Sequence, residues 1–139
     1  MEEILKGLKQ RPPFLFVDEI VEKGPNHIHT RKYVKADEYY FRGHFPENPI
    51  MPGVLLQECA FQSGSLILVD EKNENKTGVV SRVSDVKFRS LVRPGDIVDI
   101  KVELKNHLSG AYFFEARLFV ENKRVCQLNF TCNLVDNNV

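Results

Sequence analysis

The chain has 139 residues with 42% hydrophobic content, which suits one domain, 1–139, built around a single core. Its 19 Lys and Arg balance 19 Asp and Glu, so no global field attracts nucleic acid or an acidic membrane. Three cysteines, an odd number without CxxC spacing, argue against a disulfide framework and a zinc site and indicate reduced thiols.

The first part of the chain predicts a short amphipathic helix at 2–9 and then a strand from Phe14. A turn at 23–26 leads into a second strand, so a hairpin is expected. His27 and His29 share a face of that second strand by alternation. Two histidines without a third ligand are more often surface residues, and we therefore predict no metal site.

The middle of the chain is an apolar run, 54–69, that predicts one long helix. Glu58, Gln62 and several small residues interrupt the run, which makes it too polar for a membrane span. The start, Met1-Glu-Glu, is no signal peptide, so a soluble, cytoplasmic protein is expected.

The remainder of the chain is β-rich. A polar stretch at 70–76 precedes three segments that predict strands, near 78–91, 96–107 and 111–134. Their breaks fall at 93–95, 109–110 and 121–123. The order of two strands, one long helix and four strands shows no βαβ alternation, which favours an α+β fold with an antiparallel sheet.

Glu58 is the only charged residue between Glu47 and Asp70. A carboxylate in such apolar surroundings loses hydration, which raises its pKa and marks it as a candidate general acid. The preceding segment, GHFPENPIMPG (43–53), holds His44 in a loop stiffened by three prolines, and His44 is a candidate general base. Pro52-Gly53 opens the helix, so the Gly53 amide could bind an oxygen that becomes negative.

These groups suit dehydration of a 3-hydroxyacyl thioester. His44 would take the C2 proton, Gly53 N–H would polarise the carbonyl, and neutral Glu58 would protonate the leaving hydroxyl. Gln62, one helical turn after Glu58, is either a hydrogen-bond donor to that carboxylate or a structural amide. The plainer alternatives are a loop histidine that only packs and a buried carboxylate that only meets a structural partner.

The segment GHFPENPIMPGVLLQECAFQ (43–62) resembles the signature of FabZ-type 3-hydroxyacyl-[acyl-carrier-protein] dehydratases. The match covers Gly43, His44, Phe45, Pro46, Pro49, Met51, Pro52, Gly53, Val54, Leu55, Glu58 and Gln62 in one register. Residues 11–20 and 86–96 extend the resemblance over most of the chain. It implies a hot dog fold, a curved antiparallel sheet wrapped around a long central helix.

The resemblance also implies that two protomers pair, with His44 facing Glu58 of the partner chain, and that no cofactor is needed beyond the phosphopantetheine arm of acyl carrier protein. It points further, to a trimer of dimers. The related FabA type, which also isomerises the double bond, usually has aspartate where this chain has Glu58. We therefore expect dehydration without isomerisation.

The chain departs from the family pattern before the strand that begins near residue 86. The tyrosine associated with gating the acyl tunnel falls on Val79, and a small glycine falls on Arg82. The segment 8–13 also lacks the proline and histidine that often precede the arginine matching Arg11. These differences suggest a divergent member that serves a specialised acyl chain.

Four cations in the β-rich segment 78–91 and just after it are candidate contacts for the acidic carrier protein and its phosphate: Arg82, Lys87, Arg89 and Arg93. An ordinary solvated face explains them equally well. Besides the dehydratase, two further functions stay open for the chain: an acyl thioesterase of the same fold, and a catalytically silent subunit that binds acyl carrier protein.

Overall fold

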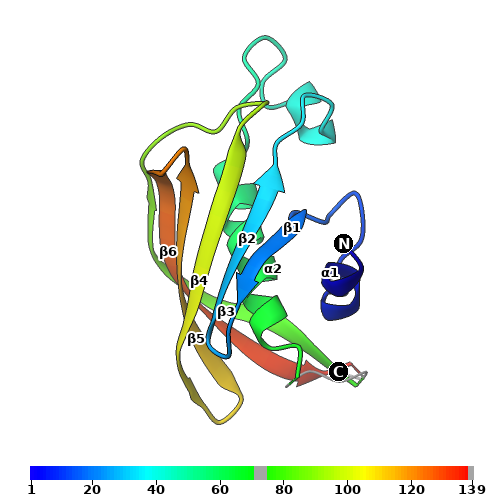
Figure 1. Cartoon of the computed structure of the whole chain (residues 1–139), viewed down its shortest axis with the longest axis vertical. Coiled ribbons are helices and arrows are strands. Elements are labelled where there is room, and N and C mark those ends of the chain that lie inside the picture. The colour runs from blue at the N-terminus through cyan, green and yellow to red at the C-terminus, as the bar shows by residue number, and fades with distance from the viewer. Residues whose placement is uncertain (71–74, 138–139) are drawn as a thin grey trace.

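The computed structural model describes residues 1–70 and 75–137. Over these ranges the chain forms a six-stranded antiparallel sheet in the order β1-β2-β4-β5-β6-β3, with the central helix α2 against one face (Figure 1). The strands are β1 (Glu19–Lys23), β2 (His27–Tyr33), β3 (Lys76–Phe88), β4 (Ile97–Leu108), β5 (Ala111–Val120) and β6 (Lys123–Asp136). The helices are α1 (Glu2–Gly7), α2 (Gly53–Ile67) and the short 3-10 helix η1 (Tyr39–Arg42). The predicted α+β hot dog fold is confirmed.

Helix α2 packs closely on the sheet because the side chains that it buries there are small. Cys59, Ala60 and Ser63 are almost fully buried, and a Cβ atom added at Gly64 would lie 2.9 Å from the ring of Phe130. The Ser63 hydroxyl lies 2.7 Å from that of Thr30 on β2. The helix therefore has one fixed position relative to the strands beneath it.

The two faces of the sheet alternate along each strand, as the period of two requires. On β4 and β5 the inner face buries Ile100, Val102 and Leu118, whereas the residues between them point outward. On β2 the same alternation places Lys32 on the inner face, where only 4% of its surface is exposed. The structure thus holds a lysine inside its core.

Two predicted element boundaries, at the end of the first helix and at the start of the first strand, differ in the structure. The first helix ends at Gly7, and the strand predicted from Phe14 begins instead at Glu19. The reason is that the backbone at Phe14 and Phe16 bonds the side chain of Gln62 on α2 and not a neighbouring strand. Residues 71–74 of the predicted polar stretch lie outside the described residues.

The break predicted within 111–134 is confirmed, because Glu121 and Asn122 form a turn between β5 and β6 with φ values of 51° and 65°. Asparagine tolerates this left-handed region better than most residues. All three cysteines are buried in the core, as core packing predicts.

Candidate active site

The loop that carries His44 is fixed at both ends by backbone hydrogen bonds. Its start follows η1, and the His44 N–H donates to the carbonyl of Tyr40 at 3.0 Å. Its end is held where the Met51 N–H donates to the carbonyl of Val92 at 2.8 Å. The loop and η1 lie together at the end of the sheet shown at the top of Figure 1. The imidazole is therefore carried by an anchored segment.

The His44 ring is held in one tautomer. Its Nδ1 lies 2.9 Å from the carbonyl oxygen of Ile50, and an oxygen that can only accept requires Nδ1 to be protonated in the neutral ring. The lone pair then resides on Nε2, which is the atom a general base uses. The ring also stacks on Phe45, with 4.2 Å between ring centroids.

Glu58 lies on α2 and is half-buried. Burial raises the pKa of its carboxyl above the ordinary value, and a hydrogen bond from Gln62 offsets part of that rise. The Gln62 Nε2 donates to Glu58 Oε2 at 3.1 Å. A carboxyl with a raised pKa retains its proton nearer to neutral pH, which is what a general acid needs.

Gln62 is fully buried, and its amide can point only one way. Its Oε1 accepts from the Phe16 N–H at 2.8 Å, so Nε2 must face the opposite side. There it donates to the carbonyl of Phe14 at 3.0 Å and to the carboxyl of Glu58. The segment that precedes β1 thereby orients the amide that holds Glu58.

Gly53 begins α2, directly after Pro52. The first backbone bonds of this helix come from Leu55 and Leu56, which donate to the carbonyl of Pro52, so the amide of Gly53 precedes them and points out of the helix start. The Phe88 ring at the end of β3 covers the glycine, and an added Cβ would lie 2.8 Å from it. A larger residue at position 53 would therefore displace the Phe88 ring.

His44 and Glu58 share no hydrogen bond among those of the described residues. Within the described residues β3 is one of the two edge strands of the sheet, and the ring of its last residue, Phe88, lies over Gly53. Apolar side chains are exposed along this strand and near its end: Val79, Val80, Val83, Phe88 and Leu91. The loop residue Phe45 and the helix residue Val54 are exposed as well, at 47% and 69%.

Comparisons with known proteins agree with this geometry. A family model described as the FabA-like domain matches residues 8–129. The chain is 38% identical to the 3-hydroxyacyl-[acyl-carrier-protein] dehydratase FabZ of Lactiplantibacillus plantarum over 93% of this chain and 89% of that protein. The chain belongs to the FabA-like family. Within it, the chain is a FabZ-type member, as the resemblance in residues 43–62 predicts.

Two further relatives named FabZ cover nearly the whole of this FabZ-type chain. That of Alkaliphilus metalliredigens is 38% identical over 98% of this chain and 94% of its own, and that of Cupriavidus taiwanensis is 35% identical over 96% and 93%. Among solved structures, the dehydratase heterocomplex ApeI:P from Xenorhabdus doucetiae matches with a TM-score of 0.81 at 14% identity, covering 97% of this chain and 92% of that one. At that identity the match shows the shared fold.

The four cations singled out in this FabZ-type sequence do not gather in one place. Arg93 donates to the side chain of Asn48 at 2.7 Å and so belongs to the His44 loop. Arg82 pairs across the sheet with Thr131, whereas Lys87 pairs with Gln127. Along β6 those two partners are separated by about 13 Å. Only Lys87 and Arg89 lie together.

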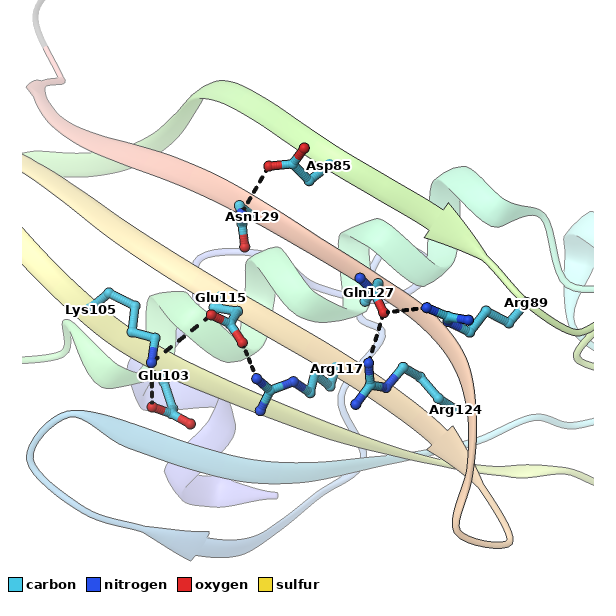
Figure 2. Close-up of polar contacts among 9 residues, drawn as sticks. All are labelled: Asp85, Arg89, Glu103, Lys105, Glu115, Arg117, Arg124, Gln127 and Asn129. Carbon is cyan, nitrogen blue, oxygen red and sulfur yellow. Dashed lines mark hydrogen bonds and ion pairs between the residues drawn. The ribbon is translucent and has the colours of Figure 1, made fainter.

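A residue that the sequence reasoning missed joins them. Arg124 and Arg89 both donate to Oε1 of Gln127, at 2.8 and 3.2 Å, as Figure 2 shows. The Arg124 guanidinium also lies 5.9 Å from the ring centroid of Phe119, and Lys101 lies 5.4 Å from the same ring. These cations come from the end of β3, from β4 and from β6, so only the register of the sheet could have revealed the group.

The two histidines of β2 have carboxylate partners. His27 lies 2.7 Å from Glu22 and His29 lies 2.7 Å from Asp99. In residues 1–70 and 75–137, no three His, Cys, Asp or Glu side chains are grouped as metal ligands. Across the same described ranges, none of the helices has the length and apolar character to cross a bilayer.

Proposed function

We propose that this chain dehydrates a (3R)-3-hydroxyacyl thioester on acyl carrier protein to the trans-2-enoyl thioester, in fatty acid or specialised acyl chain biosynthesis. The observation that carries the proposal is that the chain holds one group prepared to act as an acid and another prepared to act as a base. Glu58 has a raised pKa and an oriented hydrogen-bond donor, and His44 has its Nδ1 committed to a backbone carbonyl. Membership of the FabZ-type family supports the same reaction.

In the proposed mechanism Nε2 of His44 removes the proton from C2 of the substrate. The negative charge that develops on the thioester oxygen is stabilised by the amide of Gly53, at the positive end of α2. The electron pair from the C2–H bond then forms the double bond as the C3–O bond breaks. Neutral Glu58 gives its proton to the departing hydroxyl, and water leaves.

Each step is assigned to a group of the chain, so the scheme calls for no cofactor beyond the phosphopantetheine arm that carries the substrate. Afterwards Glu58 is a carboxylate and His44 an imidazolium, and transfer of the proton from one to the other through solvent resets both. From the glutamate at position 58 we also propose dehydration without isomerisation.

We also propose that the chain acts as a homodimer of one-domain protomers, in which His44 of one protomer meets Glu58 of its partner. The support is that the two residues share no hydrogen bond among those of the described residues, and that β3 is a long edge strand. An exposed edge strand with apolar side chains readily pairs with a second copy of itself. Sedimentation of the chain distinguishes a dimer from the trimer of dimers that the family resemblance implies.

The acidic carrier protein is proposed to dock where Arg89 and Arg124 donate to Gln127 (Figure 2), next to Lys87, which pairs with Gln127 across the sheet. Phe88 lies between two of these cations in the sequence and faces Gly53. A carrier held on the outer face would thus stand across a single strand from the proposed thioester site. We place the protein in the cytoplasm, in keeping with its three buried cysteines.

The test is turnover of 3-hydroxyacyl-acyl carrier protein of several chain lengths by wild type, His44→Ala and Glu58→Gln. Wild type should form the enoyl product, and each variant should lose about 10³-fold in kcat, since general acid and base groups commonly contribute 10²- to 10⁴-fold. Release of free thiol without enoyl product would instead indicate a thioesterase. Binding of the acyl carrier without any product would indicate the silent subunit.

A further inference from the structure

Lys32 is the only charged residue among the buried ones in the described part of the chain, with 4% of its surface exposed. It projects from the inner face of β2, whose other inward residues are Ile28 and Thr30. Burying an ammonium group is costly unless it is paired and hydrogen-bonded. The proposed reaction does not use this group, so its retention calls for another explanation.

Two carboxylates surround the ammonium. The Nζ of Lys32 lies 2.8 Å from Glu38 and 3.7 Å from Asp18. Each carboxylate is fixed by a second donor: the Tyr40 hydroxyl donates to Glu38 at 3.1 Å, and the Tyr33 N–H donates to Asp18 at 2.7 Å. The group is therefore a connected polar cluster of one cation and two carboxylates, in which loss of one member disturbs the others.

One side of the cluster leads to His44. Glu38 immediately precedes η1, and its carbonyl accepts from the Phe41 N–H at 3.1 Å. Two residues after Glu38, the carbonyl of Tyr40 accepts a hydrogen bond from the His44 N–H. The ion pair with Lys32 thus fixes the residue before η1, and η1 in turn bonds the backbone of His44.

The other side leads to Glu58. Lys32 Nζ lies 5.8 Å from the ring centroid of Phe16, within reach of a cation–π interaction. The N–H of Phe16 is the donor that orients Gln62, and Gln62 in turn donates to Glu58. The Lys32 charge also opposes the effect of burial, which raises the pKa of the Cys59 thiol next to Glu58.

From these contacts we infer that Lys32 is a positioning residue, a single buried charge that orients both the His44 loop and the amide that holds Glu58. This inference rests on the proposed function for its kinetic consequence. If the active sites form between protomers, each Lys32 orients one group in each of the two sites, so its loss affects both sites.

The test compares Lys32→Met/Glu38→Gln with Lys105→Met/Glu103→Gln. Both double variants remove a lysine and one of its two carboxylate partners and leave nearly isosteric neutral side chains, but Lys105 and Glu103 are exposed on the outer face, 3.2 Å apart. Kinetics are measured on a short pantetheine-type thioester that bypasses carrier docking, alongside melting temperature. The His44 ring resonances, assigned by their loss in His44→Ala, are followed by NMR across pH.

The Lys32 variant should stay folded, keep KM within about 2-fold and lose about 10- to 100-fold in kcat, because small misplacement of reacting groups costs that much. Its His44 resonances should shift, and the control variant should match wild type in all three readouts. A folded Lys32 variant with wild-type kcat and unchanged His44 resonances overturns the inference.

Failure of the proposed function is a separate result. If wild type dehydrates no thioester, the function falls, while the His44 resonances still report whether Lys32 orients that ring. If the double variant does not fold, Glu38→Gln alone carries the same comparison, because it leaves Lys32 paired with Asp18. Unchanged kcat and unchanged His44 resonances in that variant would likewise overturn the inference.

Discussion

The two faces of the sheet use polar residues in opposite ways. The outer face carries an alternating chain of charges in which each member contacts its neighbour (Figure 2): the exposed Glu103 and Lys105 and the half-buried Glu115 and Arg117. Between the inner face and α2, the described ranges bury only four polar residues, each with a partner: Thr30 and Lys32 on β2, and Gln62 and Ser63 on α2. The many charges of the outer face are therefore expected to contribute less to stability than the few buried polar groups.

The two faces differ because the outer charges are solvated by water and the inner polar groups are not. An exposed ion pair is screened by water and contributes about 0–1 kcal/mol to stability. A buried polar group that loses its partner has no water to replace it, so the cost is larger and the remaining groups move. Function is therefore expected where polar groups are scarce and bonded, around Gln62 and Lys32, more than where charges are abundant.

After the catalytic variants His44→Ala and Glu58→Gln, the largest effect on kcat is expected from Gly53→Ala on the inner side. The added methyl meets the Phe88 ring, and because Phe88 is 51% exposed the ring yields without unfolding the chain. The shift alters the helix start and should reduce kcat about 100-fold, as loss of oxyanion stabilisation does. Steady-state kinetics with a melting curve check this. Adding Phe88→Leu should recover part of the loss, and an unchanged kcat in Gly53→Ala would remove Gly53 from the mechanism.

A smaller effect is expected on the outer face from Arg89→Glu combined with Arg124→Glu. Removing the two cations on Gln127 should raise KM for the carrier-bound substrate about 10-fold and weaken its salt dependence, because rim charges steer association. The KM for a short pantetheine-type thioester should not change. Lys6→Glu on α1 makes the same kind of charge change away from the group and serves as the control. Equal effects in both variants would rule out a docking surface at Gln127.

Glu58→Gln should raise stability while it removes activity. Burial raises the pKa of Glu58 in the folded chain, so stability that depends on its proton is present below the ordinary pKa and is lost as pH rises through the raised value. Glutamine stays neutral at every pH. Above the raised pKa of Glu58, the melting temperature of the Glu58→Gln variant should therefore exceed that of wild type by about 2–4 °C. The two melting temperatures should converge in acid. A constant difference across pH would show that the carboxyl does not titrate as stated.

The smallest effect is expected from Lys105→Ala in the outer chain of charges. Lys105 is half exposed and its partners stay solvated, so the free energy of unfolding should change by about 0.5 kcal/mol or less. Denaturant unfolding with an unchanged slope checks this. A loss of several kcal/mol would mean that the two faces differ less than their burial indicates.

Much of the fold and of the site was predictable from local sequence. Pro52-Gly53 marks the start of α2, and an isolated Glu58 in an apolar run indicates burial, which the structure shows as a raised pKa. Both features depend on neighbours within a few residues. The same holds for the turn at Glu121-Asn122.

The features that the sequence did not predict depend on how distant segments of the chain are aligned in the fold. The strand predicted at Phe14 was displaced because Gln62, 46 residues away from Phe16, takes its backbone bond. Arg93 joins the His44 loop through Asn48, and Arg124 meets Arg89 only once β3 and β6 are aligned. Lys32 had a signal, since alternation with Ile28 places it on the inner face, but a lysine at such a position is normally expected to point outward.

The most direct test of the account is a mixed dimer of His44→Ala and Glu58→Gln chains, isolated with two different tags. If His44 and Glu58 meet across the interface, one of its two sites is intact, and turnover should return to about half of the wild-type value. A dimer of wild type with the double variant should then be inactive, because each site lacks one group. The reverse pattern, an inactive mixed dimer and an active wild-type and double-variant dimer, would contradict the account and place the catalytic pair within one chain.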